Sequence, residues 1–203
     1  MIEHANDIYG RQSNLCVVDP HTRFTVVGCG GTGFWVALFL AMSGAKHLNL
    51  FDPDYLSVSN LNRLPFSLRA VGRAKTALLK ILIRHLRPAC FLTTNAKATN
   101  FSLSIYNHDV IFDCTDRSDA QAMLYRYCQH HSCCYIRCGY DGMRINVTRQ
   151  HSDWSTGEQD GYTINPSWVV PAVIAAAYAV ANYLLPNNVD FMGDFRSATP
   201  KVK

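Results

Sequence analysis

The amino-acid sequence predicts one α/β domain built on an open, mostly parallel, twisted sheet with helices on both faces. An apolar run stops at closely spaced glycines, a second ends on an acid about 20 residues later, and a third also ends on an acid. The 203 residues, 48% of them hydrophobic, suffice for one sizeable core but not for two ordinary domains. We divide the chain into an N-terminal arm or helix (1–22), a core (23–148), and a crossing loop, C-terminal helix and tail of the same domain (149–203).

The first strand-helix-strand unit spans residues 24–52. Residues 24–28 (FTVVG) form an apolar run that stops at a glycine, which predicts a strand. Residues 32–44 are apolar nearly all round and close on a glycine, which predicts a buried helix. Residues 47–52 (HLNLFD) alternate and end on an acid, so they predict a second strand, parallel to the first and joined by a right-handed crossover.

A long connection and a second unit follow. Residues 53–71 lack clear periodicity and carry two prolines, which is typical of a connection that is functional or disordered. Residues 109–113 (DVIFD) form an apolar strand that ends on an acid, as the earlier strand does. The other predicted elements are a helix at 72–86, a strand at 90–94, a helix at 118–131, and strands at 133–139 and 143–148.

The last part of the chain predicts a loop and a buried helix. Residues 149–165 are polar and contain glycine, and we expect a flexible loop that crosses the ligand-binding face. The apolar stretch from Trp168 to Leu185 carries Pro171 near its start and Asn182 near its end, which favours a buried helix, starting at about residue 165, over a membrane span. The tail after Pro186 is expected to be loose.

Charge and cysteine content indicate which partners and which redox setting to expect. The formal net charge of +4 comes without any run of like charges, so a nucleic-acid partner is not indicated. Eight cysteines would suggest disulfides in a short secreted chain, but residues 1–15 are polar and mixed in charge and do not form a secretion signal. We therefore expect free thiols and a reducing, cytoplasmic setting.

Three glycines follow the G-x-G-x-x-G spacing of a phosphate-binding turn. Without side chains at Gly28, Gly30 and Gly33, backbone amides can approach a phosphate and the helix can pack close to the strand. The additional Gly31 suits a bulkier triphosphate, and Asp52 can hold a ribose. This pattern alone fits a nicotinamide-dependent oxidoreductase as well as an ATP-binding enzyme.

The residues after Asp52 favour ATP. Ser59, Asn60, Asn62 and Arg63 follow, and Lys75 opens the next predicted helix. An ATP tail carries about four negative charges, which must be neutralised and positioned for attack at the α-phosphate. An arginine can engage phosphate bidentately, a lysine serves as a point charge, and an asparagine adds hydrogen bonds without charge. A solvated surface position is the alternative for each basic residue taken alone.

Two acids mark the end of the strand at 109–113. Asp113 and Asp116 lie where ligands bind in open α/β sheets, and a carboxylate there can hold magnesium against phosphates. The alternative is that Asp116 caps the helix beginning near Ser118.

The order of these motifs resembles the ThiF/MoeB-type adenylyltransferases, which belong with the ubiquitin-activating enzymes, over residues 9–148. That resemblance implies a Rossmann-like fold and an enzyme that uses ATP and Mg²⁺ to activate a C-terminal carboxylate as an acyl-adenylate. The motifs that carry it are Tyr9-Gly10-Arg11-Gln12, Gly28 to Gly33, Asp52-Pro53-Asp54, Ser59 to Arg63, Val71 to Lys75, and Asp113 to Asp116.

The resemblance also implies roles by position and a partner. The substrate would be a small ubiquitin-like or sulfur-carrier protein, or a peptide, whose C-terminus ends in glycine. Arg11 would reach into the site of a second subunit, so a homodimer is expected. The implied nucleotide-binding residues are Gly28, Gly30, Gly31, Gly33, Asp52 (ribose), Asp54, Asn60, Arg63 and Lys75 (phosphates), and Asp116 is the implied magnesium ligand; the implied catalytic residues are Arg11, Arg63, Lys75 and Asp116.

The chain departs from that family in its cysteines. Family members commonly hold a structural zinc with two C-x-x-C pairs, whereas no C-x-x-C occurs here, so no zinc site is expected. Cys133, Cys134 and Cys138 are expected to be structural thiols, with 134 and 138 on one face of a strand and 133 on the other. Residues 139–203 contain no cysteine, which excludes a thioester formed in the crossing loop.

Three alternatives to this function stay open at the sequence level. The same fold could activate a carboxylate on modified tRNA. The chain could instead be a non-catalytic, partner-binding homologue, although such a protein needs none of Asp52, Arg63, Lys75 and Asp116. An NAD-dependent oxidoreductase is the third alternative, and it leaves the two cations and Asp116 unexplained.

Overall fold

The computed structural model describes residues 8–96, 98–99, 103, 108–151, 167–185 and 191–194, and all structural statements below concern those residues. Most of the predicted crossing loop (149–165), the predicted start of the last helix, the beginning of the N-terminal arm and most of the tail lie outside them. Among these residues, every helix is too short or too polar to cross a membrane.

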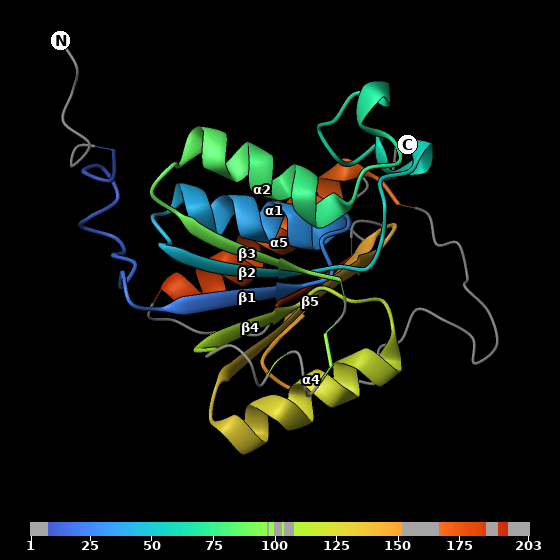
Figure 1. Ribbon diagram of the computed structural model, residues 1–203. Coiled ribbons are helices and arrows are strands. Elements are labelled where there is room, and N and C mark those ends of the chain that lie inside the picture. Colours follow the sequence, from blue (N-terminus) through green and yellow to red (C-terminus); the bar gives the residue numbers. More distant parts are fainter. Residues whose placement is uncertain are drawn as a thin grey trace, which may run out of the picture.

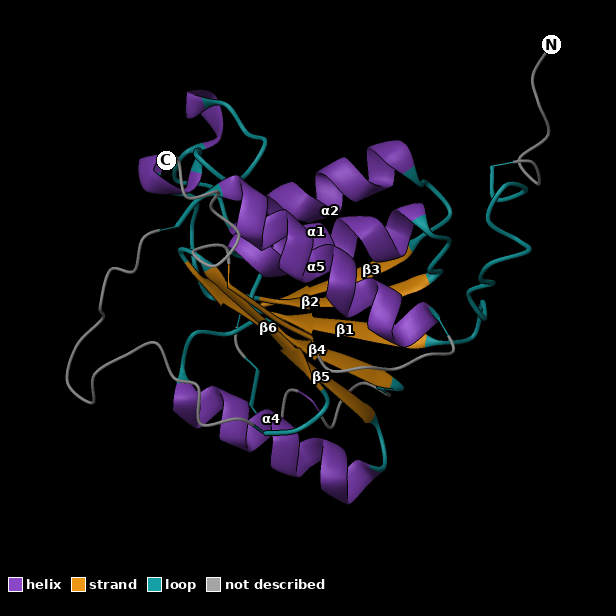
Figure 2. Ribbon diagram, turned by 180° about the vertical axis from the view of Figure 1, so that it is seen from behind, coloured by secondary structure: helices purple, strands orange, loops and turns teal. Residues whose placement is uncertain are grey.

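The protein is an α/β sandwich around one seven-stranded sheet, in the order β3-β2-β1-β4-β5-β6-β7. The first five strands in this order are mutually parallel, and β6 and β7 are antiparallel additions at one edge. Helices α1, α2 and α5 cover one face and α4 covers the other (Figures 1 and 2). The elements are β1 (Arg23–Val27), α1 (Gly31–Met42), β2 (His47–Phe51), the 3₁₀ turns η2 (Val58–Asn60) and η3 (Leu68–Ala70), α2 (Lys75–Leu86), β3 (Phe91–Asn95), β4 (Val110–Asp113), α4 (Ser118–His131), β5 (Cys134–Asp141), β6 (Arg144–Thr148), α5 (Val169–Leu184) and β7 (Phe191–Asp194).

This architecture confirms the predicted Rossmann-like class and most of the predicted elements. The start of the last helix and the tail are exceptions. The last helix begins at Val169 and not at about residue 165, because Trp168 is extended. In the tail, residues 191–194 form β7 and pair with β6 from Arg144 to Val147. The prediction of a loose tail was therefore wrong at these residues. The four-residue sequence FMGD has no alternation that would predict a strand. The strand forms because the backbone edge of β6 offers hydrogen-bonding partners to these residues.

The core has two parts, one on each face of the sheet. The larger lies under α1, α2 and α5 and includes Cys138, with Cys134 packed against it; the smaller lies under α4 and includes Tyr135, with Cys133 packed against it. The predicted division of these three cysteines between two faces is confirmed. All eight cysteines are free thiols.

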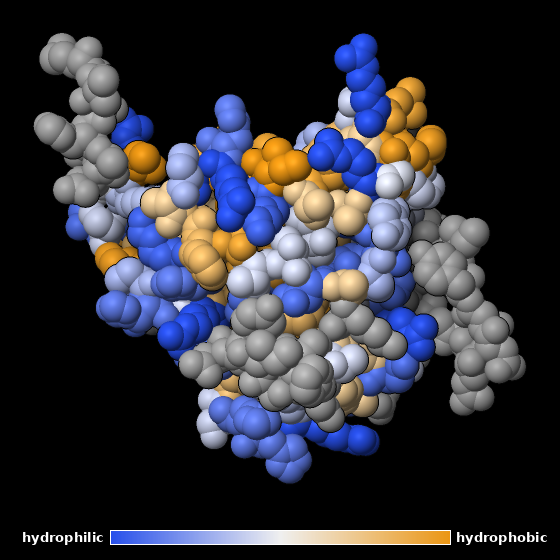
Figure 3. Space-filling model, in the orientation of Figure 1, coloured by the Kyte–Doolittle hydropathy of each residue, from blue (hydrophilic) through white to orange (hydrophobic). Residues whose placement is uncertain are grey.

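The connection between β2 and α2 lies at the carboxyl end of the sheet. It carries exposed apolar side chains, including Val58 and Leu68 on its two 3₁₀ turns. Figure 3 shows apolar surface over this part of the molecule. The parallel strands all point to the same end, so this connection, the turn after β1 and the turn after β4 meet there (Figure 1).

Candidate functional site

The turn between β1 and α1 can be built only with glycine at two positions. Gly28 has φ +86°, and a Cβ there would lie 2.7 Å from the carbonyl oxygen of Cys114. A Cβ on Gly33 would lie 1.7 Å from the carbonyl oxygen of Gly28. The strand, the turn and the first turn of α1 therefore pack backbone against backbone, which no residue other than glycine permits at these two positions.

The N-terminus of α1 leaves room beside Gly30. Among the described residues, a Cβ on Gly30 would meet no atom within 4 Å. Gly30 is the N-cap residue and contributes no side-chain cap, and the first turn of α1 contains no acid. The amide of Phe34 donates to the Gly30 carbonyl, so the amides before Phe34 have no acceptor within the helix. Such a helix end attracts anions, and the open glycine cradle fits a phosphate chain.

Gly31 has a different surrounding from the one that we predicted. A Cβ there would lie 2.5 Å from the hydroxyl oxygen of Tyr140 and 3.0 Å from Cδ of Arg63. The space left by this glycine thus holds two side chains of the protein itself and is not kept open for a bulkier triphosphate. As a consequence, Arg63 and Tyr140 converge on the glycine turn.

Asp52 follows directly after β2 and is held beside the glycine turn. Its side chain is buried, and its two oxygens accept hydrogen bonds from the amides of Cys29, at 2.6 Å, and Asp54, at 2.7 Å. Burial raises the pKa of this carboxyl group, and Lys75 and the two amides partly oppose that shift. Two amides leave further lone pairs on the carboxylate, which suit the hydroxyl groups of a ribose.

Lys75 and Asp54 form an ion pair across the entrance to α2. Lys75 Nζ lies 2.7 Å from Asp54 Oδ2; the lysine side chain is 11% exposed and the aspartate side chain 63%. The amide of Lys75 also donates to the Asp54 carbonyl. Asp54 therefore orients Lys75 from the solvent side. Of the two acids near Lys75, Asp52 is the buried one and Asp54 the exposed one.

Arg63 and Asn60 lie on the connection after β2. Arg63 Nη1 donates to the Ser59 carbonyl and to Asn62 Oδ1, at 2.8 and 2.9 Å. Trp35 of α1 donates to the Arg63 carbonyl at 3.1 Å, which ties the connection to the helix of the glycine turn. Asn60 is buried, and its Oδ1 accepts from the amide of Ser57, so this oxygen shapes the turn and only its Nδ2 group could donate to a ligand.

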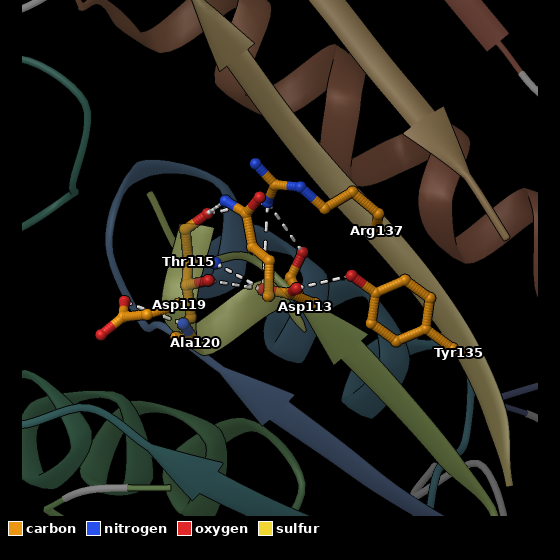
Figure 4. Close-up of polar contacts among 7 residues, drawn as sticks. Asp113, Thr115, Asp119, Ala120, Tyr135 and Arg137 are labelled. Carbon is orange, nitrogen blue, oxygen red and sulfur yellow. Dashed lines mark hydrogen bonds and ion pairs between the residues drawn. The ribbon is translucent and has the colours of Figure 1, made fainter. Parts of the chain in front are cut away.

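The two acids after β4 lie in opposite environments. Asp113 is fully buried; its Oδ2 accepts from the Tyr135 hydroxyl at 2.7 Å, and its Oδ1 accepts from the amide and hydroxyl of Thr115 (Figure 4). Asp116 is exposed. The N-cap residue of α4 is Arg117, without a side-chain cap, so the alternative that Asp116 caps this helix is wrong. Asp116 is the acid of this pair that can meet a ligand.

An exposed carboxylate is a suitable magnesium ligand, because Mg²⁺ prefers hard oxygen donors. In the described ranges, no group of three or more His, Cys, Asp or Glu side chains could hold a metal ion. With nucleotides, Mg²⁺ commonly binds one or two carboxylates together with phosphate oxygens and water, and a single exposed carboxylate such as that of Asp116 fits such an arrangement.

Arg11 lies far from the glycine turn of its own chain. It is exposed on the arm, whose Gln12 Nε2 donates to the Ser43 carbonyl at 2.7 Å, and whose Tyr9 ring packs beside Gly44. Both contacts are at the C-terminal end of α1, whereas the glycine turn is at its N-terminal end (Figure 1). The 12 residues of α1 span about 18 Å. The structure thus brings the other predicted residues to one edge of the sheet, but not Arg11.

Sequence reasoning missed three residues at this edge, which are Tyr140, Ser167 and Arg137. Tyr140 shares a hydrogen bond with the Ser167 hydroxyl, and Asn62 Nδ2 donates to the Ser167 carbonyl at 2.6 Å. Arg137 of β5 is buried and contacts the turn that leads to Asp116. An arginine inside an apolar run that predicts a strand was a visible signal in the sequence. Its partners, however, lie more than 20 residues away, and no spacing rule connects them to it.

Similarity to known proteins agrees with this geometry. Residues 20–165 match the model of the ThiF family. The tRNA threonylcarbamoyladenosine dehydratase of Escherichia coli K12 is 31% identical over 162 residues, which are 75% of this chain and 59% of that protein. The molybdopterin-synthase adenylyltransferase of Haemophilus influenzae is 31% identical over 141 residues, 64% of this chain and 58% of that protein. The chain thus spans somewhat more than half of these relatives.

Solved structures share the fold. The crystal structure of E. coli MccB with AMPCPP and MccA superposes with a TM-score of 0.77 at 18% identity, covering 95% of this chain and 72% of that one. The crystal structure of PaaA gives a TM-score of 0.72 at 22% identity and covers 93% of this chain. The family match extends over most of the sequence and includes every motif from the glycine turn to Asp116, so the chain belongs to the ThiF family.

Proposed function

We propose that this protein is an ATP- and Mg²⁺-dependent adenylyltransferase that activates a carboxylate as an acyl-adenylate. One observation carries the proposal: the open helix end at Gly30 faces the same edge of the sheet as Asp52, Arg63, Lys75 and Asp116. A dinucleotide-dependent oxidoreductase requires the glycine turn and the acid at Asp52 but not the two cations. Relatives named adenylyltransferases support the same class of reaction.

In the proposed reaction, each group has a defined task. Asp52 binds the ribose and the amides at the start of α1 bind phosphate oxygens. Arg63 and Lys75 contact the phosphates, neutralising the charge that develops as an incoming carboxylate oxygen bonds to the α-phosphorus and pyrophosphate departs. Asp116 would hold Mg²⁺, which supplies further charge neutralisation when bound.

For the acyl substrate, we propose the C-terminal carboxylate of a small carrier protein or peptide that ends in glycine. The molybdopterin-synthase adenylyltransferase relatives and the structural likeness to MccB, which was crystallised with MccA, support this class of substrate. We further propose that two copies assemble and that Arg11 of each completes the site of the other.

A carboxylate on modified tRNA is the second candidate. Two relatives named tRNA threonylcarbamoyladenosine dehydratase match 74% and 75% of this chain, more than the molybdopterin-synthase adenylyltransferases do. The chain has a positive formal charge of +4, which is compatible with a polyanion although no basic cluster marks a binding surface in the sequence.

ATP–pyrophosphate exchange tests both candidates. Exchange is measured with Mg²⁺ and either glycine-ended carrier proteins or tRNA that carries threonylcarbamoyladenosine. We expect exchange that depends on one acceptor, and its loss in Asp116→Asn and Arg63→Ala. Asp119→Asn and Arg69→Ala are matched controls, because both residues are exposed charges near their counterparts in sequence. ATP binding without exchange would favour a non-catalytic partner, and absence of ATP binding would contradict the proposal.

A further inference from the structure

Arg137 is a buried cation that fold stability does not explain. It is 3% exposed on β5, and its nearest acid, Asp113 Oδ1, lies 3.9 Å from Nη1. Asp113 is already engaged by Thr115 and Tyr135, so no bidentate arginine–carboxylate pair forms. Among the described residues, Arg137 Nε has no hydrogen-bond partner. A methionine would occupy much of this space without the desolvation cost of a charged group.

The best contact of Arg137 is to a backbone carbonyl. Its Nη1 donates to the Thr115 carbonyl at 2.7 Å (Figure 4). Gln121 Nε2 of α4 donates to the same oxygen at 3.0 Å. The amide and the hydroxyl of Thr115 both donate to Asp113. Every polar group of Thr115 is therefore held by a residue on β4, β5 or α4.

This carbonyl belongs to the same planar peptide group as the amide nitrogen of Asp116. Because a peptide unit is rigid, two donors on the Thr115 oxygen also set the direction in which the chain enters Asp116. Asp116 itself is exposed and lies beyond the end of β4. An exposed ligand at the start of a loop is held in place only by what anchors the residues next to it.

We propose that Arg137 is a positioning residue that, through the Thr115 carbonyl, orients Asp116 toward Mg²⁺ and the ATP phosphates. This inference rests on the proposed function. Gln121 has the same task with a neutral donor and hence a smaller effect. Outer groups that orient a metal ligand typically change metal affinity by about 10- to 100-fold when removed.

The test is the Mg²⁺ dependence of ATP binding, measured by equilibrium dialysis of labelled ATP at a series of Mg²⁺ concentrations. In Arg137→Met, the Mg²⁺ concentration that gives half of the Mg²⁺-dependent increase in ATP binding should rise on the order of tenfold. ATP binding without Mg²⁺ should stay unchanged. Arg137→Lys keeps a charged donor and should recover part of this loss. Gln121→Met should raise the concentration by a smaller factor and serves as the second variant if Arg137→Met does not fold.

Two comparisons separate positioning from a general loss of stability. Thr93→Val removes a partly buried hydrogen bond between β3 and Asn49 of β2, near the opposite edge of the sheet from Arg137, so it can lower the melting temperature but should leave the Mg²⁺ dependence unchanged. In an Asp116→Asn background, Arg137→Met should have no further effect on Mg²⁺ dependence.

An unchanged Mg²⁺ dependence in Arg137→Met and Gln121→Met would overturn the inference, and so would an equal shift in Thr93→Val. Pyrophosphate exchange by the wild-type protein decides the proposed function separately. Exchange with an unchanged Mg²⁺ dependence in the variants would refute only the role of Arg137. A wild-type protein that binds no ATP at all would refute both.

Discussion

A Cβ on Gly33 would lie 1.7 Å from the carbonyl oxygen of Gly28, whereas a Cβ on Gly30, three residues earlier, would meet no atom of the described residues within 4 Å. One glycine of the turn is therefore required by packing and the other leaves space at a helix end. The same substitution at the two positions should separate folding from ligand binding.

Gly33→Ala forces β1 and α1 apart and should destabilise the protein by on the order of 3 kcal/mol or more, or prevent folding. Gly30→Ala, by contrast, should leave the melting temperature nearly unchanged, because its Cβ meets no atom in the described part of the chain and the residue has a negative φ. ATP affinity should nonetheless fall in Gly30→Ala, since the methyl group enters the space before α1. Thermal unfolding and equilibrium ATP binding check the pair; unchanged ATP affinity in Gly30→Ala would show that phosphate does not bind there.

Lys75→Met should weaken ATP binding by about tenfold, because a nearly buried ammonium at the site edge is replaced by an apolar chain. Asp54→Asn should change stability by less than about 1 kcal/mol, since its carboxylate is exposed and surface ion pairs contribute little. Lys80→Met, five residues further along α2, is the control for loss of a positive charge. Equal effects of Lys75→Met and Lys80→Met on ATP affinity would argue against a direct phosphate contact.

The buried carboxyl group of Asp52 should make stability fall as pH rises. Its pKa is raised in the folded state, so the folded protein binds this proton more tightly than the unfolded chain does. The resulting stabilisation is fully present below the unfolded pKa of about 3.9 and is lost as pH increases through the raised folded pKa. In Asp52→Asn, this residue does not titrate, so its contribution to the free energy of unfolding does not fall as pH rises.

Urea unfolding of both proteins from pH 3.5 to 7 measures the effect. The free energy of unfolding of Asp52→Asn, relative to wild type, should increase with pH across this interval. A difference that stays constant, or that decreases with pH, contradicts the raised pKa. ATP binding should also be weaker in Asp52→Asn at neutral pH, because the amide offers a ribose one acceptor oxygen in place of two.

Arg11 lies at the wrong end of α1 to serve its own site, which predicts complementation between two inactive variants. Arg11→Ala and Asp116→Asn should each lose pyrophosphate exchange, and a mixture unfolded and refolded together should regain about a quarter of wild-type activity, because mixed dimers keep one intact site. Sedimentation velocity should show a dimer. Without recovery in a mixture that does contain mixed dimers, Arg11 has no role in the partner's site.

The order of elements was predictable because each apolar run and each glycine acts locally. The helix predicted at 118–131 has the observed bounds, and the strands around the glycine turn differ by about a residue at their ends. Asp52, Arg63, Lys75 and Asp116 could be proposed as one site because parallel strands end at a common edge. Strand β7 could not be predicted, since its pairing is a property of β6.

The sequence by itself determined the parallel sheet and the chemical character of the site, because these follow from residue type, periodicity and spacing along the chain, and its motifs carried the resemblance to the ThiF family. Tertiary structure alone decided that Asp113 is buried and Asp116 exposed, and that Arg63 and Tyr140 fill the space at Gly31. It also decided that Arg137 and Gln121 share the Thr115 carbonyl. The physical reason is that burial and hydrogen-bond partners depend on strands and helices that are distant in sequence, and side-chain direction changes at every residue of a strand.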